Sequence, residues 1–173
     1  MYKKIFITFL SLLLPFYAVF GSSFDYDLGF ESNNDLWFSK NNLVEGETIR
    51  IYARVHNFGN KDVTGSVTFF QGSVLFAESQ AVSLTGGGVS DEVFVDFIVT
   101  EGEFNILARV HGTAPSDQNS ANNETLSGKF TPDHDTDHDG IGDSSDIDDD
   151  NDGIDDSQEG SRGTDPLNRD SDG

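Results

Sequence analysis

Apolar and polar residues alternate with a period of two over much of the middle of the chain. Residues 49–55 read Ile-Arg-Ile-Tyr-Ala-Arg-Val, and within residues 92–99 Val93, Val95 and Phe97 share one face. Because successive side chains of a strand point to opposite faces of its sheet, this pattern predicts half-buried β-strands. Further strands are expected at residues 63–70, 82–84, 104–110 and 125–130.

Turn sequences separate the predicted strands. They include residues 57–60 (Asn-Phe-Gly-Asn), 71–72 (Gln-Gly) and 86–88 (Gly-Gly-Gly). About seven short strands at a spacing of roughly ten residues are typical of an all-β, immunoglobulin-like antiparallel β-sandwich, with an open barrel as the structural alternative. We expect this sandwich to occupy residues 22–131, and no stretch has a sustained helical period.

The first 21 residues have the pattern of a secretory signal peptide. Lys3 and Lys4 precede an apolar run over residues 5–14, and Val19-x-Gly21 offers small residues for cleavage. Pro15 interrupts the apolar stretch, which is short for a membrane span. The sequence therefore predicts a secreted or cell-surface protein with no membrane span in its mature chain, and an uncleaved anchor is the alternative.

The end of the chain is strongly acidic. Residues 133–173 hold sixteen acidic residues and two basic ones, a net charge of −14 within a chain of net charge −21. Nucleic acids and anionic membranes need basic patches, so this charge argues against both as partners. Without cations, a segment with so few apolar residues is expected to be disordered. The chain contains no cysteine, which excludes disulfides.

The acidic residues fall into two copies of one loop, thirteen residues apart, within a segment that we delimit as residues 132–173. Each copy has carboxylates at positions 1, 3 and 5, followed by Gly140 or Gly153 at position 6. Such spacing surrounds one point with hard oxygen ligands, and the glycine permits the reversal that brings later positions back, so Ca²⁺ is the expected ion. The predicted donors are Asp135, Asp137, Asp139, the Ile141 carbonyl, Asp143 and Asp146 in the first loop, and Asp148, Asp150, Asp152, the Ile154 carbonyl, Asp156 and Glu159 in the second.

Other residues of the acidic segment lie off this pattern. Asp133, Asp149 and Asp155 either bridge neighbouring ions or face solvent, and the sequence leaves both readings open. His134 and His138 occupy non-ligand positions and are expected to be bystanders. The alternative for the whole segment is a solvated acidic tail without bound ions.

Two further expectations concern this segment. A third loop starts at Asp170-x-Asp172, where the sequence ends at its third ligand position, so we expect the chain to be part of a longer protein. Glycines disfavour regular helix, and the segment is therefore expected to contain neither helix nor sheet. These glycines are Gly140, Gly142, Gly153 and Gly160.

Two resemblances follow from these motifs. Residues 44–49 (Val-Glu-Gly-Glu-Thr-Ile), Val55-x-Asn57-x-Gly59, residues 102–110 and the Asn122-Asn123 pair resemble the cell-adhesion-related domain found in bacteria (CARDB), an immunoglobulin-like module. Residues 133–159 resemble thrombospondin type 3 repeats of bacterial surface proteins. Together they imply a calcium-binding surface protein whose partner is a cell-surface or matrix protein, or a glycan.

The sandwich offers little sign of catalysis. No Gly-x-Ser-x-Gly motif or other nucleophile context accompanies its serines and histidines, so we expect no enzyme activity. Trp37 and the phenylalanines are expected to fill the core, with an exposed aromatic platform for sugar as the alternative. The leading interpretation is an adhesion or spacer module on a calcium-rigidified stalk. The alternatives are a dockerin-like assembly module and an accessory region of a larger secreted hydrolase or outer-membrane protein.

Overall fold

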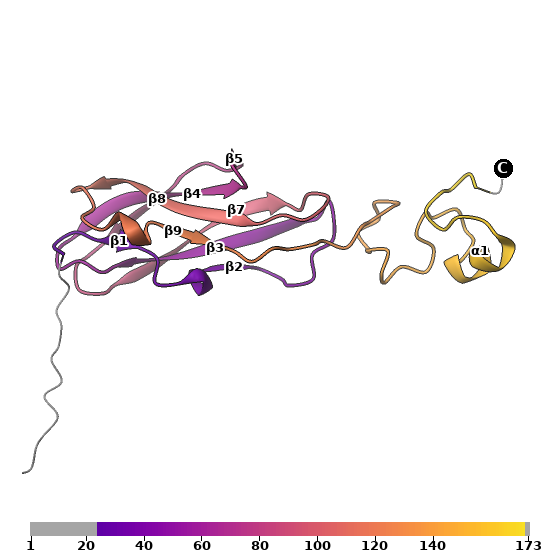
Figure 1. Cartoon of the computed structure of the whole chain (residues 1–173), viewed down its shortest axis with the longest axis horizontal. Helices are drawn as coiled ribbons and strands as arrows, with labels where there is room; N and C mark the ends of the chain where they lie inside the picture. Colours follow the sequence, from indigo (N-terminus) through magenta and orange to yellow (C-terminus); the bar gives the residue numbers. More distant parts are fainter. Residues whose placement is uncertain (1–23, 172–173) are drawn as a thin grey trace, which may run out of the picture.

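The computed structural model describes residues 24–171, so the predicted signal peptide and Asp172 lie outside it. Two sheets pack face to face, and the acidic segment extends from one end of them as a chain of loops (Figure 1). The prediction of an all-β antiparallel sandwich is therefore confirmed. None of the helices within residues 24–171 has the length and apolar character that a membrane crossing requires.

The first sheet is organised around its long strand β3. The whole of β7 pairs with one edge of β3, and Ile51 of β3 lies opposite Val95 of β7. β1 pairs with the C-terminal end of β3, and β2 pairs with its middle, at residues 51–53. All three pairings are antiparallel, and the strands are β1 (Leu28–Gly29), β2 (Leu36–Phe38), β3 (Thr48–Asn57) and β7 (Ser90–Ile98).

The second sheet is organised around β4 in the same way. β4 lies between β8 and β6, β9 extends the sheet beyond β8, and β5 pairs with the end of β4. Short 3₁₀ turns at Asn33–Asp35 and Ser120–Asn122 precede β2 and β9. The strands are β4 (Val63–Gln71), β5 (Val74–Leu75), β6 (Gln80–Leu84), β8 (Ile106–Ala114) and β9 (Glu124–Leu126).

The core lies between the sheets and is built by the inward-facing residues of each strand. Ile51 and Val55 of β3 meet Phe69 of β4 and Ile106 of β8, and all four are fully buried. Burying a large aliphatic or aromatic side chain stabilises a fold by roughly 1.5–3 kcal/mol. The alternation seen in the sequence thus produces a core made of residues from both sheets.

Trp37 is not part of this core, contrary to expectation. Leu36 points inward, so strand alternation places Trp37 on the outer face of the sheet, where it is half-buried. There its ring stacks on Tyr52 at 5.4 Å, and the guanidinium of Arg54 lies 5.3 Å from the ring centre. The phenylalanines are divided, because Phe69 is buried whereas Phe94 is exposed.

The acidic segment contains one short helix, which contradicts the expectation of a segment without helix. This helix, α1 (Asp156–Arg162), has acidic residues in its first turn and Arg162 in its last, as the helix dipole favours. Gly163 closes it in the left-handed conformation, with its N–H donating to the Glu159 carbonyl at 2.8 Å. These contributions offset Gly160, whose cost in a helix is about 1 kcal/mol.

Candidate metal centre

Two groups of carboxylates lie where the sequence predicts the calcium loops. In each group the ligand oxygens lie within 4.8 Å of one another, and each group could hold a metal ion. These oxygens belong to positions 1, 3 and 5 of the two loops. The first group is Asp135, Asp137 and Asp139, and the second is Asp148, Asp150 and Asp152.

The backbone of the two loops follows the same path. Gly140 and Gly153 have φ angles of +94° and +95°, a conformation that side-chain-bearing residues rarely adopt. Each glycine N–H donates to the position-1 carboxylate of its own loop at 3.0 Å, Asp135 in the first and Asp148 in the second. The internal repeat seen in the sequence is therefore a repeat of structure.

Several carboxylates of these loops have buried oxygens without a hydrogen-bond donor. Asp135 and Asp150 are each 4% exposed, and one oxygen of each lacks a partner. Glu159 is 0% exposed, and neither of its carboxylate oxygens has one. Burial raises the pKa of Asp150 and Glu159, with neighbouring carboxylates adding to the rise. A buried carboxylate is costly unless it is paired or binds a metal, so these residues fit a hard cation.

The position-12 residues of the two loops differ. Glu159, on α1, is buried near the second group, since the charges of Asp150 and Asp152 add to the rise in its pKa that burial causes. Asp146 is half-buried, and its Oδ1 accepts the N–H groups of Ile147 at 2.6 Å and Asp148 at 3.2 Å. Glu159 therefore lies near the carboxylate group of its own loop. Asp146 instead binds backbone N–H groups at the start of the next loop.

The position-9 carboxylates both bind backbone within their loops. Asp143 accepts the Thr136 N–H at 2.9 Å, and Asp156 accepts the Asp149 N–H at 3.0 Å. The Ile141 and Ile154 carbonyls accept no hydrogen bond from the described residues, and their role as donors to an ion stays a prediction. Asp170, at the start of the third loop, is exposed and belongs to neither group.

Asn151 connects the two loops. It has a φ angle of +57°, and its side-chain amide donates to Oδ2 of Asp137 in the other loop. Its carbonyl accepts from the Arg169 guanidinium at 2.7 Å, which brings a basic group beside the second loop. Hydrogen bonding by the Asp139 N–H is the main cause of a lowered pKa at Asp137, with smaller contributions from Asn151 and Arg169.

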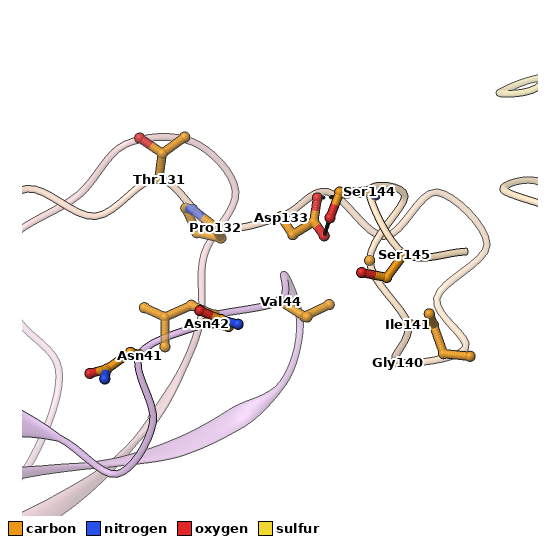
Figure 2. Close-up of a pocket in the computed structure, with 12 residues that line it drawn as sticks. Asn41, Asn42, Val44, Thr131, Pro132, Asp133, Gly140, Ile141, Ser144 and Ser145 are labelled. Atoms are coloured by element: carbon orange, nitrogen blue, oxygen red, sulfur yellow. Dashed lines mark hydrogen bonds between the residues drawn. The ribbon is translucent and has the colours of Figure 1, made fainter. Parts of the chain in front are cut away.

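The first loop also contacts the end of the sandwich. Asp133 forms a parallel β-bridge with Val44, and its carbonyl accepts the Glu45 N–H at 2.9 Å. The His134 ring lies 2.5 Å from the Glu45 carboxylate, which raises the pKa of the histidine. Asp133 itself accepts a hydrogen bond from the Ser144 hydroxyl, and both residues line a cleft of about 660 Å³ (Figure 2). Asp133 and His134 thus join the two parts, and neither belongs to the carboxylate groups.

Of the three residues that the sequence left open, Asp155 is exposed, Asp133 contacts the sandwich, and Asp149 is buried. It lies off the ligand pattern, yet it is 9% exposed, and its Oδ1 has no hydrogen-bond partner. One feature of the sequence distinguishes Asp149: the equivalent position of the first loop holds a threonine, Thr136, and not a carboxylate.

No protein family matches the sequence, and no curated protein does. A crystal structure of a CARDB domain from Pyrococcus furiosus in complex with di-metal ions is similar, with 20% identity and a TM-score of 0.49, over 62% of this chain and 88% of that one. A solution structure of a CARDB domain from the same organism gives 17% identity and a TM-score of 0.48, over 63% of this chain and 96% of that one.

Proposed function

We propose that the chain is a calcium-binding, non-enzymatic part of a secreted or cell-surface protein. Its sandwich acts as an adhesion or spacer module, and its acidic segment is a stalk that calcium makes rigid. The observation that carries the proposal is the set of buried carboxylate oxygens that have no hydrogen-bond donor in both loops, and Glu159 is the most deeply buried of these residues.

The ligand chemistry favours calcium over other ions. All side-chain donors in the two groups are carboxylate oxygens, which hard cations prefer, whereas a transition metal favours nitrogen or sulfur. The donor set predicted from the sequence has six members in each loop, and a bidentate Glu159 adds a seventh oxygen in the second. Calcium accepts six to eight ligands in flexible geometry, whereas magnesium demands a near-ideal octahedron.

Ion binding and ordering of the segment are coupled in this proposal. A net charge of −14 over residues 133–173 opposes any compact arrangement until cations neutralise it. The bond between Asn151 and Asp137 then holds one loop against the other, and the bridge between Val44 and Asp133 holds the first loop against the sandwich. Extracellular calcium is plentiful enough to fill sites with dissociation constants of about 10⁻⁴–10⁻³ M.

Calorimetric titration of the chain, begun at Ser22, tests the proposal. Calcium should give saturable heat at millimolar concentration, and magnesium much less. Asp139→Ala and Asp152→Ala should each weaken one loop, because each removes a charged member of one group. Asp155→Ala is the matched control, since Asp155 is exposed, lies in the same segment and belongs to neither group. Absence of saturable calcium binding in the unaltered chain refutes the proposal.

A dockerin-like module fits these observations less well. That alternative requires an apolar face on the helix that follows each loop. α1 reads Asp-Ser-Gln-Glu-Gly-Ser-Arg and offers no apolar residue, and its buried member is Glu159. Helix α1 therefore turns a carboxylate inward where a docking helix would present aliphatic side chains.

A further inference from the structure

The outer face of the first sheet carries a row of three aromatic rings. Tyr52 of β3 lies opposite Trp37 of β2 in one ladder and opposite Phe94 of β7 in the other. The ring centres of Trp37 and Tyr52 are 5.4 Å apart, and those of Tyr52 and Phe94 are 6.0 Å apart. The row therefore runs straight across three neighbouring strands.

Part of this row is open to solvent. Phe94 is 46% exposed, and Trp37 and Tyr52 are half-buried. The planes of Trp37 and Tyr52 differ by 5°, and their separation is that of an offset pair, in which neither ring covers the other completely. Aromatic side chains gathered on a solvent-facing surface are a feature of interaction sites.

Ion pairs border the row on both sides. Arg50 of β3 pairs with Asp96 of β7 at 3.1 Å, and its guanidinium lies 4.1 Å from the centre of the Phe94 ring. On the other side of the row, Arg54 of β3 pairs with Glu92 of β7 at 2.7 Å. Two arginines are thus balanced by two carboxylates, so the borders of the row carry no net charge within a chain of net charge −21.

A polar hollow of about 450 Å³ adjoins the row at Tyr52. Its lining consists of Ser39, Thr48, Ile49, Arg50, Tyr52 and Asp96. The hydroxyl, guanidinium and carboxylate groups of this lining donate and accept hydrogen bonds beside an aromatic ring. A pyranose ring needs this combination, because its C–H face packs on an aromatic ring while the hydroxyls at its rim bind polar groups.

We propose that the outer face of the first sheet binds a neutral, extended, β-linked oligosaccharide. A straight row of rings on successive strands matches the repeat of an extended sugar chain, whereas a helically coiled chain would leave the row after one unit. The inference names the partner of the sandwich, and its meaning as adhesion rests on the proposed function. The binding face itself contains none of the predicted calcium ligands.

Size and charge argue against other occupants of this face. A fully buried aromatic side chain covers about 150–250 Å². Three partly covered rings therefore offer a few hundred Å², whereas each partner in a stable protein complex buries about 800 Å². A second copy of the chain or an anionic polysaccharide would also be repelled by the net charge of −21.

Calorimetric titration of the chain begun at Ser22 with cellohexaose and with chitohexaose tests the proposal, in excess chelator and again with millimolar calcium. At least one of the two sugars should bind saturably, with the same affinity in both conditions. Trp37→Ala and Phe94→Ala should each weaken binding by about tenfold or more, because each removes one ring. Leu126→Ala is the matched control and should bind like the unaltered chain, since Leu126 is an exposed apolar residue on β9 of the other sheet.

Phe94→Ala changes an exposed side chain, so it tests the row even if Trp37→Ala alters the sheet. Saturable binding of neither sugar overturns the inference, and so does binding that both ring variants leave unchanged. Sugar binding that disappears in chelator assigns the site to the calcium loops and also overturns it. Self-association of the chain that Phe94→Ala abolishes, measured by sedimentation, overturns it in favour of a second copy. Sugar binding in a chain that binds no calcium supports this site and refutes the proposed calcium function alone.

Discussion

Replacement of Asn57 by alanine should destabilise the sandwich strongly. Asn57 ends β3, and its side chain is fully buried. Its amide nitrogen donates to the carbonyls of Lys61, Leu84 and Thr85 at 2.9, 3.2 and 3.0 Å. Its Oδ1 accepts the Gly59 N–H at 2.9 Å. One side chain thus connects the end of β3 to the turn that follows it and to the end of β6.

The size of the stability loss depends on which of these backbone groups can be hydrated once the Asn57 side chain is removed. Lys61 and Thr85 are exposed, so their carbonyls can be hydrated after the substitution. The Leu84 carbonyl and the Gly59 N–H belong to buried residues and stay unpaired. A buried unpaired polar group costs about 1–3 kcal/mol, so two such groups give a loss of roughly 4 kcal/mol. For a domain of this size that lowers the melting temperature by more than about 10 °C.

Urea unfolding followed by the fluorescence of Trp37, the chain's single tryptophan, measures this loss. Asn34→Ala is the control, because Asn34 is exposed and its side chain makes no hydrogen bond among the described residues. Asn57→Asp should be worse than Asn57→Ala at neutral pH, since a carboxylate oxygen then faces three carbonyls. Equal stability of Asn57→Ala and Asn34→Ala refutes the argument.

Three further predictions concern the acidic segment. Glu159→Gln should weaken calcium binding at the second loop alone, and calorimetry should show the first loop unchanged; equal weakening of both loops contradicts the assignment. Burial raises the pKa of Asp149 to about 6 from its ordinary 3.8, so the stability it contributes to the ion-free segment is present below pH 3.8 and is lost as the pH rises through about 6. Amide NMR spectra of the chelated protein should therefore be better dispersed at pH 4 than at pH 7. Better dispersion at pH 7 would contradict the predicted direction of this pH dependence. Chelation should not change the melting transition of the sandwich, which Trp37 fluorescence follows. Loss of this transition on chelation would show that the sandwich depends on bound ions.

The long strands were predictable because alternation persists over enough residues to define a period. β3 and β7 correspond to the predicted strands at residues 49–55 and 92–99. β1, β2 and β5 have two or three residues each, too few to show a period, and they form because a longer strand offers them an edge. Predicted residues 125–130 form β9 and an isolated bridge from Phe130 to Phe104.

The loops were predictable where their geometry is local. Positions 1, 3 and 5 and the glycine at position 6 are close in sequence, so their spacing alone brings them together. Asp149 is buried and lies near Asp143 and Asp146 of the first loop, so its surroundings depend on how the two loops pack, which no local pattern encodes. Helix α1 was missed because Gly160 argued against it, whereas its cap at Gly163 depends on a backbone conformation.

The two parts of the chain follow opposite burial rules. In the sandwich most buried residues are apolar, as Phe69 is. In the acidic segment Glu159 is 0% exposed, whereas Ile147 is 69% exposed and Leu167 is also on the surface. Apolar burial cannot stabilise an arrangement that keeps its aliphatic residues outside and its carboxylates inside, and the carboxylates repel one another. In the proposed function cations offset that repulsion, so the inverted burial is the physical reason to expect that ion binding and order in this segment rise and fall together.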